Sequence, residues 1–119
     1  MAGRMLVLLC SLALLIITVS CADRSTSAKT KAEEIWRQHK AVVDAAARRE
    51  KVDLEAFHDA CVFFENLTGI AVPGDASTLI DWYPTDQTRT AIRPLNDWYR
   101  QNGDKLYWDE GSQTVKLLP

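Results

Sequence analysis

The chain has 119 residues, a formal net charge of −2 at pH 7, and 47% hydrophobic and 25% charged residues. A chain of this length forms one domain that buries a modest core. It contains no basic cluster dense enough for nucleic acid, so nucleic-acid binding is excluded from the functions that we consider.

The first residues have the anatomy of an export signal. Arg4 supplies a positive charge, residues 5–17 are apolar, and the small residue Ser20 stands directly before Cys21. A secretory signal has this order of charge, apolar stretch and small-residue cleavage site. A membrane-spanning helix needs about 20 apolar residues, and a generous count over 5–22 comes close to that length.

The four residues Thr18-Val19-Ser20-Cys21 resemble the lipobox of bacterial lipoproteins that signal peptidase II processes, with Thr18 where Leu is usual. The resemblance covers residues 1–21 only. It implies a signal peptide over 1–20, cleavage before Cys21, and lipid attachment to that cysteine. By the same resemblance, Ala22 after the cysteine implies sorting to the outer membrane if the cell is Gram-negative.

The rest of the chain then divides into a lipid-anchored tether over 21–29 and a small globular domain over 30–119. Two or more acyl chains give stable membrane anchoring, whereas one is marginal. Two alternatives remain open: secretion after cleavage behind Ala22, and retention of the apolar segment as a membrane helix. Because Cys10 leaves with the signal and Cys21 carries lipid, Cys61 is the one thiol left and is expected to form no disulfide, except with an unlipidated Cys21.

The charges are distributed unevenly. Residues 23–51 hold eight basic and five acidic residues, whereas residues 52–119 hold five basic and eleven acidic ones. A basic segment beside a lipid anchor could lie against anionic headgroups. Charges of both signs are interleaved in it, however, which favours a solvated helix face.

Two helices are expected in the first half of the domain. Thr30 and Glu33 form a capping box, and the apolar spacing after them predicts a helix that continues to about Lys51. Asp53 is a good N-cap for a second helix, and Gly69 is placed to end it in a left-handed turn. The short connection predicts an antiparallel helical hairpin.

A third helix is expected over about 88–102, beginning nearer Ile92 if Pro94 occupies its first turn. Gly103 follows it as a stop. Residues 106–108 and 114–117 then read as a β-hairpin, which is marginal alone and must pack on the helices. The predicted fold is therefore mainly α: a helical hairpin plus a third helix, with a C-terminal β-hairpin packed on it.

The strongest candidate for chemistry is the pair His58 and Cys61, which are neighbours on the second helix. A Cys-His pair can activate a thiolate, and Glu65 would add a third metal-ligand type. Cys61 nevertheless lies on the same apolar stripe as Phe57 and Phe64, where a buried thiol is inert packing. We therefore expect no catalytic residue, no metal site and no cofactor.

The segment 70–88 is the candidate contact surface. It contains a turn at 73–75, and Pro84 is expected to block regular structure around it. Asp81, Trp82 and Tyr83 stand in it as candidate contacts for a ligand or partner. Core packing is the favoured role of the tryptophans, and Trp82 is the one most expected to be exposed. His39 is expected to be a solvated surface residue.

These observations predict a membrane-anchored lipoprotein of the cell envelope that acts as a non-catalytic interaction module. Its partners would be the membrane, through the N-terminal lipid, and an envelope protein or polysaccharide. The alternatives are a small envelope enzyme that uses the Cys/His pair, and a purely structural lipoprotein.

Overall fold

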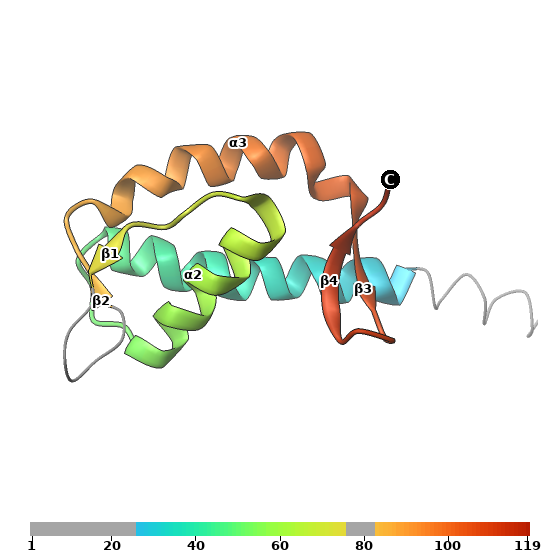
Figure 1. Ribbon diagram of the computed structural model, residues 1–119, viewed down its shortest axis with the longest axis horizontal. Coiled ribbons are helices and arrows are strands. Elements are labelled where there is room, and N and C mark those ends of the chain that lie inside the picture. Colours follow the sequence, from blue (N-terminus) through green and yellow to red (C-terminus); the bar gives the residue numbers. More distant parts are fainter. Residues whose placement is uncertain (1–25, 76–82) are drawn as a thin grey trace, which may run out of the picture.

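The computed structural model of the protein describes residues 26–75 and 83–119. Within these ranges the fold is mainly α, with three helices and a C-terminal β-hairpin, as expected from the sequence (Figure 1). Helix α1 covers residues 26–47, α2 is Leu54–Thr68, and α3 is Ile92–Asn102. Strands β3 and β4 are Leu106–Asp109 and Thr114–Leu117. The 3-10 turns Thr88–Ala91 and Gly103–Lys105 stand before and after α3.

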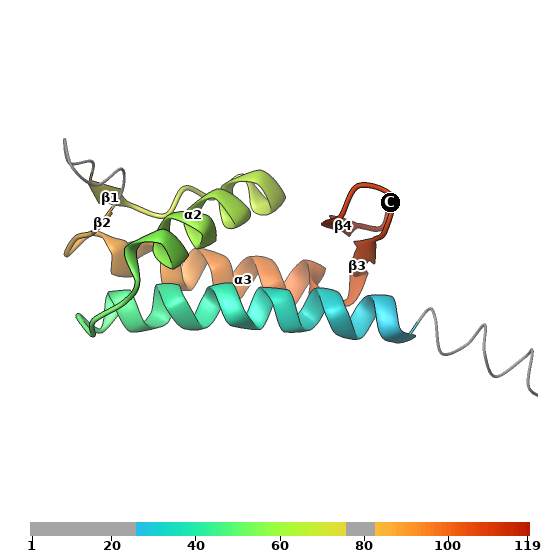
Figure 2. The same ribbon diagram turned by 90° about the horizontal axis from the view of Figure 1, so that it is seen from below.

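Helix α1 is the longest element and lies along the whole domain, with α2 and α3 running back beside it (Figures 1 and 2). The capping box predicts a start at Thr30, but residues 26–29 are already helical. The predicted start is therefore wrong, because Ser27, Ala28 and Lys29 include no Gly or Pro to stop the helix. The last four residues of the expected tether, 21–29, belong to this helix. The expected signal peptide and Cys21 lie outside the described residues.

The C-terminal end of α1 comes earlier than the predicted Lys51. The N–H of Arg49 donates to the carbonyl of Ala46 at 3.1 Å, and the N–H of Glu50 donates to Ala45 at 3.0 Å. This pair of bonds is a Schellman motif. It places Arg49 in the left-handed region, with φ 63°, where glycine is usual.

Both predicted caps of α2 are confirmed. The carboxylate of Asp53 accepts a hydrogen bond from the N–H of Ala56 at 3.2 Å. At the other end Gly69 has φ 75°, and its N–H donates to the carbonyl of Glu65 at 2.9 Å. Both ends of this helix are therefore capped by hydrogen bonds between residues close in the sequence.

The third helix begins at Ile92, as Pro94 indicates, because a proline in the first turn removes an N–H that has no helical partner anyway. Gly103 follows the helix as its C-cap, as expected. Its φ is −59°, so it is not left-handed. A Cβ at this position would lie 3.0 Å from ring atoms of Tyr99, which explains why the site needs glycine.

The C-terminal hairpin has the predicted strands and turn. In its antiparallel register Leu106 lies opposite Leu117, and Asp109 lies opposite Thr114. The hairpin packs against α1, where the ammonium of Lys31 stands 4.1 Å from the centroid of the Trp108 ring. Strand β4 is the strand nearer to the end of α2 (Figure 1).

A second, very short strand pair joins β1 (Gly74–Asp75) to β2 (Tyr83–Pro84) in antiparallel register. The sequence predicts a turn at 73–75 and no regular structure around Pro84. Both predictions are wrong, because Gly74–Asp75 and Tyr83–Pro84 form paired strands. A proline can occupy such a two-stranded edge, because its carbonyl still accepts a hydrogen bond.

The buried hydroxyl of Thr88, just before α3, forms hydrogen bonds with residues that flank the β1–β2 pair. It donates to the carbonyl of Pro73 at 2.7 Å and accepts from the N–H of Thr85 at 3.0 Å. Thr88 is fully buried, so both partners are satisfied away from water.

The core is centred on Trp36. Its ring lies edge-on to Phe64, with centroids 4.8 Å apart, and stacks on Trp98 and Tyr99 at 5.3 and 4.9 Å. All three helices thus meet at one aromatic cluster, which is the expected use of large rings in a small core. The buried hydrophobic residues are Ala32, Trp36, Val43, Ala46, Phe57, Ala60, Cys61, Phe64, Val72, Ala91, Leu95 and Leu106.

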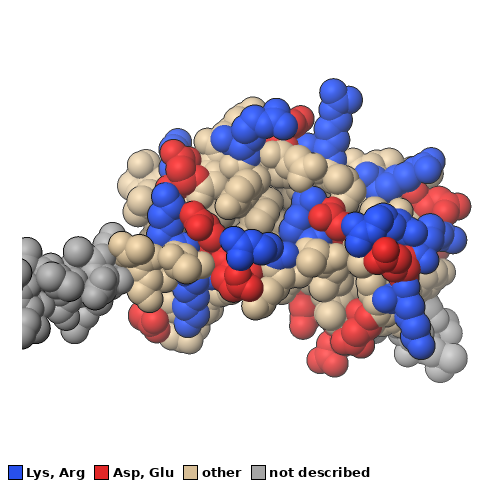
Figure 3. Space-filling model, turned by 180° about the vertical axis from the view of Figure 1, so that it is seen from behind, with Lys and Arg blue, Asp and Glu red and all other residues tan. Residues whose placement is uncertain are grey.

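Charges of both signs alternate over the surface. Figure 3 shows one face on which Lys and Arg side chains are interleaved with Asp and Glu. On α1, Arg37 pairs with Glu34, and Lys40 pairs with Asp44 at 2.6 Å. Such pairing is typical of a solvated helix face.

Candidate functional site

The structure separates the environments of His58 and Cys61. The side chain of His58 is exposed on α2, whereas Cys61 is buried in the core and only 7% exposed. Over 26–75 and 83–119, no group of three or more His, Cys, Asp or Glu residues could hold a metal ion. In the same part of the chain, no helix has the length and apolar character needed to cross a membrane.

Of the three expected contact residues, Asp81 and Trp82 lie outside the described residues. Tyr83 is half-buried in β2, and its hydroxyl donates to the carboxylate of Asp75 at 3.3 Å. The negative charge of Asp75, together with burial, raises the pKa of Tyr83. This phenol is thus held in a local hydrogen bond beside the short strand pair.

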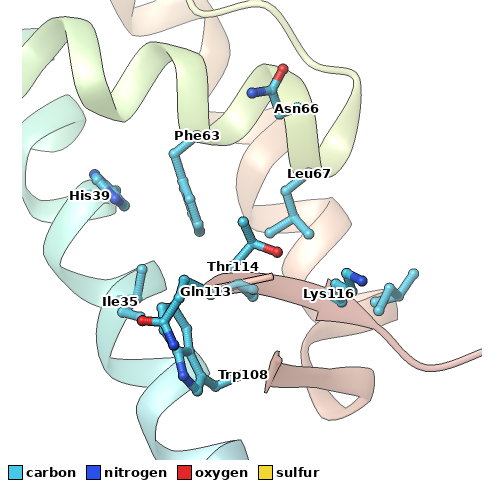
Figure 4. A pocket seen from close by; sticks show the side chains of 11 residues that line it. Ile35, His39, Phe63, Asn66, Leu67, Trp108, Gln113, Thr114 and Lys116 are labelled. Carbon is cyan, nitrogen blue, oxygen red and sulfur yellow. The ribbon is translucent and has the colours of Figure 1, made fainter. Parts of the chain in front are cut away.

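A different site is formed where the hairpin meets the helices. A groove of about 650 Å³ lies between α1, the C-terminal part of α2 and β4 (Figure 4). Its volume lies in the range of known ligand sites. The groove is lined by Ile35, His39, Phe63, Asn66, Leu67, Trp108, Gln113, Thr114, Val115, Lys116 and Leu117.

The helical wall of the groove combines apolar and aromatic groups. The imidazole of His39 stacks on Phe63, with ring centroids 4.3 Å apart and an angle of 26° between the planes. Burial lowers the pKa of His39, and the carboxylate of Asp59 opposes this shift. His39 is therefore half-buried and packed, so the expectation of a solvated surface residue is wrong. It packs because Phe63 and its neighbours on α2 face this side of α1.

The floor of the groove near the hairpin contains Trp108. Its ring is half-buried, and its Nε1 is shielded from solvent with no hydrogen-bond acceptor in the described part of the chain. A buried donor without an acceptor costs about 1–3 kcal/mol. The preference for core packing holds for Trp36, which is buried, and for Trp98, which packs against the core. Trp108 instead lines a groove.

The groove is lined without carboxylates, although the chain has 16 acidic residues. Its one Lys, Lys116, extends to Asp109 on β3, with Nζ 2.8 Å from Oδ2. Hydrogen bonds from Lys116 and Ser112 lower the pKa of Asp109 to about 2. The lining thus offers mainly apolar surface, with the uncharged polar side chains Asn66, Gln113 and Thr114.

Sequence reasoning missed this groove because its walls come from three separated segments. The only local signals are two pairs at helical i, i+4 spacing, Ile35 with His39 and Phe63 with Leu67, which continue the apolar stripes beyond the core. Nothing in the sequence shows that these pairs face one another or that β4 closes the third side.

Comparisons with known proteins add no relative to this geometry. No protein-family model matches the sequence, and no curated protein or solved structure matches it.

Proposed function

We propose that the chain is an exported, lipid-anchored interaction module of the bacterial envelope, and that the groove between α1, α2 and β4 holds part of its partner. The observation that carries the binding role is the groove itself, whose walls are largely apolar and include Ile35, Phe63 and Leu67. Ligand sites combine largely apolar walls with a few placed polar groups in this way. The anchored location rests on the signal-like residues 1–21.

A protein partner is better supported than a polysaccharide. A sugar-binding groove would be built from aromatic rings beside carboxylates, for which Asp81, Asp97 and Asp109 are the candidates in the sequence. Asp109 follows Trp108, but it pairs with Lys116 and does not line the groove, and the ammonium of Lys31 lies against the Trp108 ring. Apolar walls of this kind suit the side chains of a protein segment.

The two alternatives have less support. An enzyme using His58 and Cys61 needs an accessible thiolate, whereas Cys61 is buried in the hydrophobic core. Alkylation of Cys61 in the folded protein near pH 7 would favour the enzyme, and labelling only after denaturation would reject it. A purely structural lipoprotein gives no role to the groove.

Site-specific photo-crosslinking of the full chain in bacterial cells tests the binding role. A photoreactive residue replaces Asn66, which is exposed and lines the groove, and in a matched variant it replaces Asn96, which is exposed on α3. We expect a discrete crosslinked partner from position 66 and none from position 96. The same crosslinks from both positions, or none from either, would overturn the proposal.

The anchor is tested by the intact mass of the protein purified from the cell membrane. Residues 21–119 with added acyl chains are expected, and Cys21→Ser should abolish the acylated form. An unmodified chain that begins at Asp23 would instead establish plain secretion, and an uncleaved chain would establish a retained helix.

A further inference from the structure

Strand β4 borders the groove with its edge. The lining includes the five consecutive residues 113–117. Successive side chains of a strand point to opposite faces, so one face would contribute only every second residue. A continuous run therefore means that the strand lies along the groove edge-on, and this edge is the one turned toward α2 (Figure 1).

The hydrogen-bonding groups along this edge can be assigned from the ladder. Leu118 donates its N–H to the carbonyl of Lys105 at 2.8 Å, and these two residues continue the register of the hairpin. Antiparallel pairs alternate between bonded and non-bonded ones. Lys116 and Thr114 therefore pair with β3, whereas the N–H and C=O groups of Val115 and Leu117 point away from β3 into the groove.

The side chains around this edge are arranged for an added strand. Phe63 and Leu67 of α2 form the apolar wall across the groove from β4 (Figure 4). On the strand itself, Leu117 is 38% exposed, so its apolar side chain is accessible beside this wall. Within the described residues β4 has no second strand neighbour, and an open strand edge beside an apolar wall is a template for β-augmentation.

We propose that an extended peptide segment of a partner protein binds in the groove as a third strand along β4. Its backbone pairs with Val115 and Leu117, and alternate apolar side chains pack on Phe63 and Leu67. No charge is required of the segment, because Lys116, the one Lys of the groove lining, is already paired with Asp109. This inference rests on the proposed binding role of the groove.

The test uses octapeptides selected by phage display against the full chain in detergent micelles. Hydrogen exchange of individual backbone amides is followed by NMR with and without the selected peptide. The amides of Val115 and Leu117 should exchange at least tenfold more slowly in the complex. Those of Thr114 and Lys116, already bonded to β3, serve as internal controls and should change less than twofold.

N-methylation of the peptide supplies a second, independent readout. Methyl groups on the alternate amides that pair with β4 should weaken binding at least tenfold, because each removes a main-chain donor. Methyl groups on the intervening amides should have less than a threefold effect. Equal losses at all positions would overturn strand addition.

The remaining outcomes separate this inference from the proposed function. Peptide binding without protection of Val115 and Leu117, or failure to select any peptide, overturns strand addition, whereas the Asn66 crosslink decides the binding role on its own. Protection that appears without peptide and grows with protein concentration would assign the edge to a second copy of this chain, and would equally overturn the proposal.

Discussion

Two tryptophans lie in different regions of the molecule: Trp36 in the core and Trp108 at the groove. Trp36 is 5% exposed and is surrounded by rings from α2 and α3. Trp108 has Lys31 over its ring and lines the groove, and its shielded indole N–H has no acceptor in the described part of the chain. Trp36 is thus packed on by rings from two other helices, whereas Trp108 borders open space. The contrast shows that the same side chain contributes to the core in one region and to an accessible surface in the other.

The largest expected effect on stability concerns two adjacent residues of α2, one in the core and one at the groove. Phe64 is fully buried against Trp36, whereas Phe63 is half-buried and faces the groove. Phe64→Ala should lower the free energy of unfolding by about 3–5 kcal/mol, since it leaves a cavity in the core. Urea denaturation measures this loss.

Phe63→Ala is the control for Phe64→Ala. It should cost clearly less, because its ring already borders open space and a smaller cavity results. Equal losses for the two variants would mean that the groove is packed as tightly as the core, and the distinction between the two regions would fail.

The next largest effect concerns the buried hydroxyl of Thr88. Thr88→Val keeps the shape of the side chain but leaves the carbonyl of Pro73 and the N–H of Thr85 without their partner. We expect a loss of about 1–3 kcal/mol in unfolding free energy, measured by thermal or urea denaturation. Thr90→Val, whose hydroxyl bonds Gln87 at the exposed surface, should change stability by less than about 0.5 kcal/mol.

A smaller effect is expected at the end of α2, between the two regions. Gly69→Ala should cost about 1 kcal/mol, because φ is 75° there while no atom lies within 4 Å of the added methyl group. The expected loss therefore comes from the backbone dihedral φ and not from a side-chain clash. Gly111→Ala, in the hairpin turn with ordinary φ, is the matched control and should be close to neutral in the same unfolding experiment.

The smallest effect is the acid sensitivity of the hairpin. Because the pKa of Asp109 falls from 3.8 to about 2 on folding, its carboxylate stabilises the folded state above about pH 4. That contribution is lost as the pH falls toward about 2. Asp109→Asn should remove this part of the pH dependence, followed through hairpin amide shifts by NMR. Asp97→Asn, which removes an exposed pair with Arg100, should leave the hairpin titration unchanged.

The elements that the sequence predicts well are those with local determinants. Asp53 and Gly69 delimit α2 by hydrogen bonds within a few residues, and Pro94 marks the first turn of α3. The start of α1 was missed because Thr30 is a valid cap that the chain does not use. The end at Arg49 was missed because a non-glycine residue takes the left-handed position.

The groove could not be predicted in the same way. His39 looks polar in the sequence, and only the approach of Phe63 from α2 makes it part of a wall. The open edge of β4 depends on which strand of the hairpin faces α2, a choice that the hairpin pattern leaves free. Sites formed by contacts between distant segments need the tertiary arrangement, whereas caps and turns do not.

Gly103, which has no side chain, lies where the core and the hairpin meet. The ring of Tyr99 occupies the space that a side chain at 103 would need, and the same ring stacks on Trp36. The joint between α3 and the hairpin therefore lies against the aromatic cluster. A side chain added at 103 would have to displace a ring of the core at the point where the hairpin begins.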